Sequence, residues 1–121
     1  MIKGIGRAAG LAMLLSVVGL GQSAFAYTAC GGPLDWVAVI PDGRVAVQQS
    51  SAQMTTVYVC QIGGTYNGIG PDACKAILSL LLSAYTSGKT VSWFFSDPNT
   101  CANQSAYQPM VGMYWGPVIE N

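Results

Sequence analysis

The four cysteines are the residues whose chemistry is most tightly constrained by number and position. Cys30, Cys60, Cys74 and Cys101 lie in a 121-residue chain without histidine and without a CxxC pair. Zinc is therefore the less favoured reading, because structural zinc sites use closely spaced Cys and His ligands. Two disulfides are typical of small exported domains. Of three possible pairings we favour Cys60 with Cys74, tying a strand to a helix, and Cys30 with Cys101, clipping the N-terminus to a late loop.

Side chains suited to catalysis are few. Without histidine the usual general base near neutral pH is missing, and oxidised cysteines are not nucleophiles. Asp42 and Asp97 lie in turn sequences and Asp72 lies at a helix start, so each has a structural role to fill. Asp35 is the least explained acid, but nothing in its spacing from Asp97 favours a glycosidase pair. We predict no catalytic residue, no metal site and no cofactor, so an enzyme is the least favoured reading.

Binding chemistry is better supplied, by tryptophan and tyrosine. These side chains combine an apolar body with a polar tip, which suits sugar faces and protein interfaces. Filling the core is the alternative role, and we expect it for Trp93 and Tyr58 in mid-strand. Tyr66 and Tyr107 lie in loop sequences, where we expect exposure. Other members of this set are Trp36, Tyr85, Tyr114 and Trp115.

The first 26 residues have the pattern of a cleaved secretory signal. Lys3 and Arg7 precede an apolar run, and Ala24-Phe25-Ala26 has the small-x-small pattern that signal peptidase cuts after. The run is short for a membrane span, so an uncleaved anchor is the less favoured alternative. We predict a signal at 1–26, a single domain at 27–121 without a membrane span, and a secreted or periplasmic bacterial location.

The charge of the predicted mature chain excludes one class of partner. Three basic side chains stand against five acidic ones, which gives a net charge of −2. Nucleic-acid binding needs a basic patch, so we predict no nucleic-acid partner. Many Ser, Thr, Gln and Asn residues indicate an uncharged surface that recognises partners through hydrogen bonds and aromatic contacts.

The elements that position these residues are mostly strands. Alternation and β-branched or aromatic residues predict strands, and Pro41-Asp42-Gly43 predicts a turn between the first two. We expect residues 27–33 to be a lead-in and 50–54 a bend. The glycine-rich stretch 63–70 lacks the residue spacing of a phosphate-binding loop, so we interpret it as a flexible loop. The predicted strands are Leu34–Ile40, Arg44–Gln49, Thr55–Ile62, Thr90–Ser96 and Met110–Trp115.

One helix is predicted, over Pro71–Gly88, with Pro71 or Asp72 at its start and Gly88 at its end. One apolar face is predicted at Ala73, Ala76, Ile77, Leu80, Leu81 and Ala84. Leu78, Leu82 and Tyr85 form a second apolar stripe, which we interpret as an interface with another copy of the chain. Coverage by a long loop of the same chain is an equal alternative.

The order strand, strand, strand, helix, strand, strand is that of the OB-fold. We therefore predict a mainly β protein with one helix (α+β), built as a five-stranded OB-like barrel. A half-open sheet with a packed helix is the second possibility.

One part of the chain resembles a known family. It runs from Tyr58-Val59-Cys60 through Ala73-Cys74 to the helix end Ser87-Gly88-Lys89 and the following aromatic strand. The layout is similar to the B subunits of subtilase-cytotoxin and pertussis-like toxins and to small exported bacterial proteins of the same layout, over about residues 34–118. The resemblance implies an OB-like fold, a Cys60–Cys74 bridge and, in toxin members, a ring of five copies around their helices.

The resemblance also implies binding of sialylated glycans, through a Ser near the first strand and a Tyr at the end of the fourth. The matching positions here hold Leu34 or Asp35, and Phe95. We take Asp35, Trp36 and Phe95 as the candidate ligand-binding residues. The expected function is a non-enzymatic exported domain that self-associates and recognises a glycan or protein partner. The alternative is an exported protein with a structural or envelope role and no toxin partner.

Overall fold

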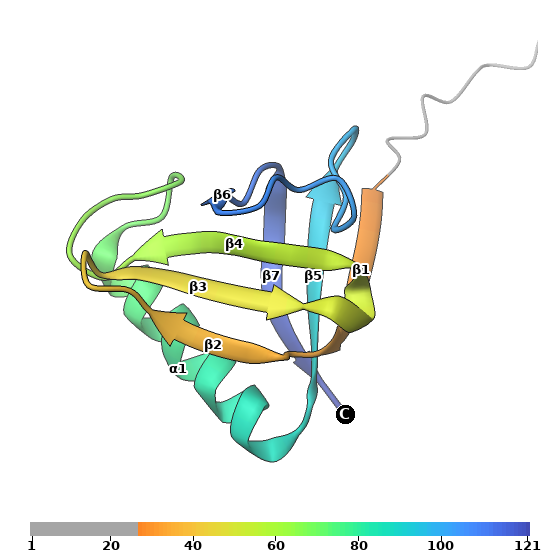
Figure 1. Cartoon of the computed structure of the whole chain (residues 1–121), viewed down its shortest axis with the longest axis horizontal. Helices are drawn as coiled ribbons and strands as arrows, with labels where there is room; N and C mark the ends of the chain where they lie inside the picture. The colour runs from red at the N-terminus through yellow and green to blue at the C-terminus, as the bar shows by residue number, and fades with distance from the viewer. Residues whose placement is uncertain (1–26) are drawn as a thin grey trace, which may run out of the picture.

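The computed structural model describes residues 27–121, and the predicted signal lies outside these residues. The protein is mainly β with one helix, as predicted (Figure 1). A short 3-10 helix, η1 (Ser50–Ala52), follows the third strand. The other elements are β1 (Tyr27–Pro33), β2 (Trp36–Val39), β3 (Arg44–Gln49), β4 (Met54–Gln61), α1 (Pro71–Ser87), β5 (Thr90–Ser96), β6 (Gln108–Pro109) and β7 (Met113–Glu120).

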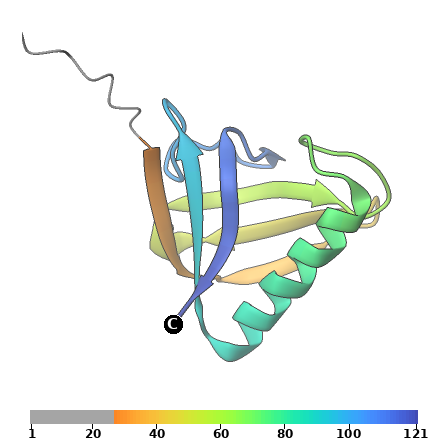
Figure 2. The same ribbon diagram turned by 180° about the vertical axis from the view of Figure 1, so that it is seen from behind.

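The strands form two open sheets. One has the order β1-β5-β7 and is antiparallel; the other has the order β2-β3-β4-β6, in which only β4 and β6 run parallel. The strands of the two sheets cross steeply in both views, and α1 lies across one end (Figures 1 and 2). Orthogonal packing of this kind encloses a core between the two inner faces.

The predicted five-stranded closed barrel is therefore corrected to seven strands in two open sheets. The difference arises because two long runs of chain each bend from one sheet into the other. Leu34 and Asp35 alone separate β1 from β2, and residues 110–112 separate β6 from β7. Hydrogen bonds continue into both bends, since the N–H of Asp35 donates to the carbonyl of Gln48 and the N–H of Ser96 to that of Gly112.

Two strand predictions are wrong at the chain ends. Residues 27–33 are not a lead-in but β1, which pairs with the whole of β5 from Tyr27 opposite Ser96 to Pro33 opposite Thr90. The last strand does not stop at Trp115 but continues to Glu120. Pro117 is tolerated there because β7 is an edge strand, where a missing N–H removes no ladder hydrogen bond.

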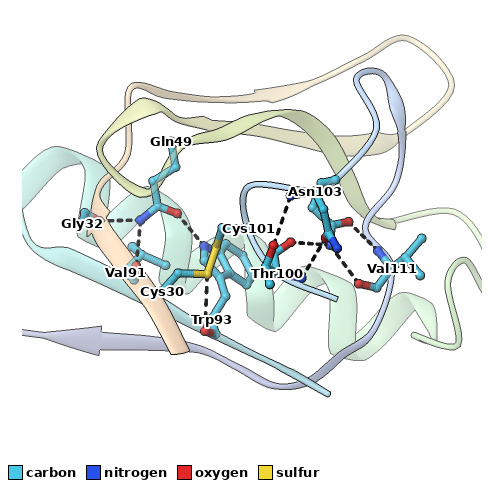
Figure 3. The surroundings of a disulfide bond; sticks show 10 residues. Cys30, Gly32, Gln49, Val91, Trp93, Thr100, Cys101, Asn103 and Val111 are labelled. Carbon is cyan, nitrogen blue, oxygen red and sulfur yellow. Dashed lines mark hydrogen bonds between the residues drawn. A yellow bond between two sulfur atoms is a disulfide. The ribbon is translucent and has the colours of Figure 1, made fainter. Parts of the chain in front are cut away.

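A buried glutamine joins the two sheets inside the core. Gln49 on β3 has no exposed surface, and its Nε2 donates to the carbonyls of Gly32 (2.6 Å) and Val91 (2.7 Å) on the other sheet. Its Oε1 accepts from the indole Nε1 of Trp93 at 2.6 Å, as Figure 3 shows. Gln49 follows Val45 and Val47 at alternate positions on β3, so the strand's pleat turns it inward with them.

Both favoured disulfides are confirmed. Cys60 on β4 is bonded to Cys74 in the first turns of α1, with Cα atoms 5.6 Å apart. Cys30 on β1 is bonded to Cys101 in the loop after β5, with Cα atoms 6.3 Å apart. No cysteine of the described residues is free. The pairs are consistent with an oxidising compartment outside the cytoplasm.

The helix has the predicted ends but a different inner face. Pro71 is its first residue, and Gly88 caps it in the left-handed conformation (φ 67°) with its N–H on the carbonyls of Ala84 and Tyr85. The buried residues are Cys74, Leu81 and Ala84, with Ile77 and Leu78 half-buried against the core. Leu78 was predicted on the outer stripe, and the structure places it inside instead. Ala73, Ala76 and Leu80 were predicted on the inner face and are exposed.

The glycine-rich loop before α1 contains a tight turn rather than a flexible run. Tyr66 and Ile69 exchange backbone hydrogen bonds of 3.0 and 2.9 Å, and the two residues between them, Asn67 and Gly68, have φ values of 56° and 75°. Asn-Gly with two positive φ values is the sequence signature of a two-residue hairpin turn. Within 27–121, no helix has both the length and the apolar character needed to cross a membrane.

Candidate binding site

The three residues proposed from the sequence as ligand contacts do not form a site. Phe95 has no exposed surface and belongs to the core, so its assignment as a ligand-binding residue is corrected. Asp35 is exposed, but both its oxygens accept from Ser50, at 2.8 and 2.9 Å, and so hold the start of η1. Trp36 is half-buried, and its Nε1 donates to the Gln48 side chain at 2.9 Å.

Exposed aromatic side chains gather instead on the outer face of the three-stranded sheet. Val91, Trp93 and Phe95 point into the core, so the alternate residue Phe94 points outward, with Trp115 opposite it on β7. Trp115 is 64% exposed and Tyr27 is 58% exposed. The sheet lies toward the viewer in Figure 2.

The tyrosines complete this group across the small side chain of Ser96. Tyr27 pairs with Ser96 on one side of β5, and its ring lies 4.9 Å from the ring of Tyr114, which comes from β7 on the other side. Four side chains from three strands thus form one surface, which we call the aromatic face: Tyr27, Phe94, Tyr114 and Trp115. An exposed group of this kind suits stacking on a planar or sugar ligand.

A cleft of about 370 Å³ adjoins the aromatic face and shares Tyr114 with it. Its other walls come from the Asn67–Gly70 turn, the first half of α1 and the bend between β6 and β7. The apolar part of the lining is supplied by Ile69, Ala73, Ile77, Met110 and Met113. The volume lies at the lower end of the range for small-ligand pockets.

The polar part of the cleft is mainly backbone. Four of the lining residues are glycines, which leave peptide groups uncovered, and a Cβ added at Gly68 or Gly70 would meet no atom within 4 Å. The amide of Asn67 donates to the carbonyl of Met110 and so links two walls of the cleft. Because the hairpin turn and this bond fix the walls, the cleft exists without a ligand to order it.

The basic side chains are engaged away from the cleft. Arg44 forms an ion pair with Asp42 (2.7 Å) and lies 4.2 Å from the ring centre of Tyr58. Desolvation lowers the pKa of the Arg44 guanidinium, but hydrogen bonds to Tyr66 and Asp42 and the charges of Asp42 and Tyr58 together outweigh it and raise the pKa. Lys75 lies 3.9 Å from Asp72, and the ammonium of Lys89 donates to the Asn121 side chain at 2.9 Å.

Few ionisable side chains lie in the cleft. Tyr114 is the one ionisable residue that lines the cleft. Over the described part of the chain, no three His, Cys, Asp or Glu side chains are grouped so that they could hold a metal ion. Large apolar side chains are also exposed on the helix, where Leu80, Leu82 and Tyr85 are each 45–48% exposed.

Sequence reasoning missed the aromatic face because it depends on strand pairing. Tyr27 was assigned to a lead-in, and nothing in the sequence alone places it beside Tyr114. One signal was available, since alternation along β5 separates Phe94 from the core residues on either side. The chain matches no protein-family model, no curated protein and no solved structure at the level that would indicate a relationship.

Proposed function

We propose that this protein is an exported bacterial binding domain without enzymatic activity, secreted or periplasmic, that recognises a glycan through the aromatic face. The observation that carries the proposal is the exposure of Trp115 and the Tyr27–Tyr114 pair on one face of a rigid sheet. Tyrosine and tryptophan rings offer large contact areas at low entropic cost, and they stack on the C–H faces of sugars. The small number of charged residues, eight in the predicted mature chain, favours this mode over electrostatic recognition.

Kinship with the toxin B-subunit layout is part of the proposal. Two features support it. If β1–β2 and β6–β7 are each counted as one bent strand, the helix lies between the third strand, β4, and the fourth, β5. The last bent strand, β6–β7, then pairs with both β4 and β5. The bent runs β1–β2 and β6–β7 correspond in this view to the first and last strands of an OB-like fold. We carry over from this kinship the general layout and no ligand-contact residue.

We also propose that copies of the chain associate through α1. Leu82 and Tyr85 retain nearly half of their surface in contact with solvent, and Leu80 does so on the other flank of the helix. Large apolar side chains exposed together in the middle of a helix are a frequent sign of an interface. The self-association and the glycan site are separable, because the helix and the aromatic face lie on different elements.

Glycan binding is tested with the mature protein, 27–121, on a glycan array followed by calorimetry with any positive sugar. Trp115→Ala should abolish the signal, because it removes the most exposed ring of the aromatic face. Tyr107→Asn is the matched control: Tyr107 is exposed but lies outside that face, and asparagine tolerates its positive φ of 57°. Glycan binding that is unchanged in Trp115→Ala contradicts the proposal. An array on which no glycan binds also contradicts it and favours a protein partner instead.

Self-association is tested by native mass spectrometry. The wild-type chain should form a defined assembly, and the double variant Leu82→Ser, Tyr85→Ser should be monomeric with an unchanged melting temperature, since both side chains lie outside the core. A monomeric wild type at every concentration tested contradicts the proposed association. It would leave the glycan proposal standing.

A further inference from the structure

We propose that the cleft beside Tyr114 is the subsite for one N-acetylated neutral sugar residue, an N-acetylhexosamine. This inference rests on the proposed glycan-binding function and adds the chemical class of the sugar and its place in the structure. It is carried by four observations on the cleft: its charge, its volume, its mixed lining and its continuity with the aromatic face.

The ligand group is neutral. No Asp, Glu, Lys or Arg lines the cleft, and the three basic side chains of residues 27–121 each have a partner elsewhere. Removing a charged group from water without a counter-charge is strongly unfavourable. A carboxylate or phosphate therefore has no partner side chain here, whereas an uncharged sugar loses little.

The size limits the ligand to about one ring. The cleft volume of 370 Å³ is near the lower limit for small-molecule pockets, whose volumes start at roughly 300 Å³. One monosaccharide with a small substituent fits this space, while a second ring would extend over Tyr114 onto Tyr27. The cleft and the aromatic face thus form consecutive parts of one path along the surface.

The lining combines apolar side chains with polar peptide groups, and an acetamido group likewise combines an apolar methyl group with a polar amide. Ile69, Ile77 and Met113, which are half-buried, offer apolar contact to a methyl group and to the C–H face of a ring, while Met110 lies fully buried behind them. Methionine adapts to irregular shapes, which suits a substituent that protrudes from a ring. Gly68, where an added Cβ would meet no atom within 4 Å, leaves its peptide groups open to an amide or a hydroxyl, whereas the carbonyls of Gly70 and Gly112 already accept from the N–H groups of Cys74 and Ser96. A plain hexose offers the C–H face of its ring but no methyl group, so it would leave part of the apolar lining without an apolar partner.

The test uses the methionine methyl groups as reporters. The mature chain contains three methionines: Met113 is half-buried in the cleft lining, Met110 is fully buried in the wall of the cleft, and Met54 is buried elsewhere. Titration of N-acetylglucosamine or N-acetylgalactosamine into the protein labelled at methionine methyl carbons should shift the signals of Met110 and Met113 and leave that of Met54 in place. Glucose and N-acetylneuraminic acid should shift neither signal at equal concentration.

Two alanines of the same helix provide a matched pair of variants. Ala73 lines the cleft and Ala76 does not, and both are exposed on α1, where leucine is an equally good helix former. Ala73→Leu should fill the cleft and weaken N-acetylhexosamine binding by at least about tenfold, whereas Ala76→Leu should leave it within about twofold. Gly70→Val, at a backbone conformation open to any residue (φ −74°), should act like Ala73→Leu.

The outcomes separate this inference from the proposed function. If glycans bind and depend on Trp115 but Ala73→Leu and Gly70→Val have no effect, the subsite is overturned and the function stands. If the acidic sugar binds in the cleft as well as the neutral ones do, the argument from charge is overturned. If Trp115→Ala leaves all glycan binding intact, the proposed function falls, whatever the methionine signals report.

Discussion

Replacing Gln49 with leucine should destabilise the fold severely, although the two side chains have similar volumes. The substitution leaves three buried groups without a partner: the carbonyls of Gly32 and Val91 and the Nε1–H of Trp93. Each buried donor or acceptor left unsatisfied costs about 1–3 kcal/mol, so the sum is at least about 3 kcal/mol. For a domain of this size the melting temperature should fall by at least roughly 12 °C.

Urea unfolding followed by tryptophan fluorescence measures this loss as a lower midpoint at unchanged slope. Gln48→Leu is the matched control, because its side chain is half-buried on the opposite face of β3 and it should cost about 1 kcal/mol or less. A cycle with Trp93→Phe isolates the indole bond, since that variant removes the donor itself. A Gln49→Leu protein within about 1 kcal/mol of wild type would refute the role assigned to the buried amide.

Three further predictions concern stability. Replacing Cys30 and Cys101 together with alanine opens a loop with a sequence separation of 71, and should lower the free energy of unfolding by about 4 kcal/mol in urea titration, more than removal of the shorter-loop disulfide. Gly88→Ala should cost about 1 kcal/mol in thermal melts followed by circular dichroism, because its φ is 67°, whereas Gly63→Ala, which has open space around it, should be nearly neutral. Asp35→Ala should cost about 1 kcal/mol by the same measurement through the lost bonds to η1 and leave glycan binding intact.

The elements with strong local signals could be predicted from the sequence. Pro71 and Gly88 mark the helix because each has a backbone preference that suits one end only, and the turn at Pro41-Asp42-Gly43 marks the β2–β3 hairpin. The disulfide pairing favoured among the three possible ones is also the one observed, and it joins a strand to the helix start and the N-terminus to a late loop.

Features that depend on tertiary contacts could not be predicted. β1 contains Gly31-Gly32-Pro33, which has no strand propensity, and it is a strand because β5 offers it a complete ladder. The helix is apolar on most of its circumference, so periodicity alone could not decide that Leu78 turns inward and Leu80 outward. The cleft draws its walls from two stretches distant in the sequence, 67–77 and 110–116, so no single stretch carries its signal.

The two bends that carry the chain from one sheet to the other have a consequence for how the molecule opens. Because β1 continues into β2 and β6 into β7, neither sheet can detach while the other stays folded. We expect one cooperative unit, in which slowly exchanging amides of both sheets share a single opening free energy in native-state hydrogen exchange. A protein built in this way offers proteases few partly open forms to attack.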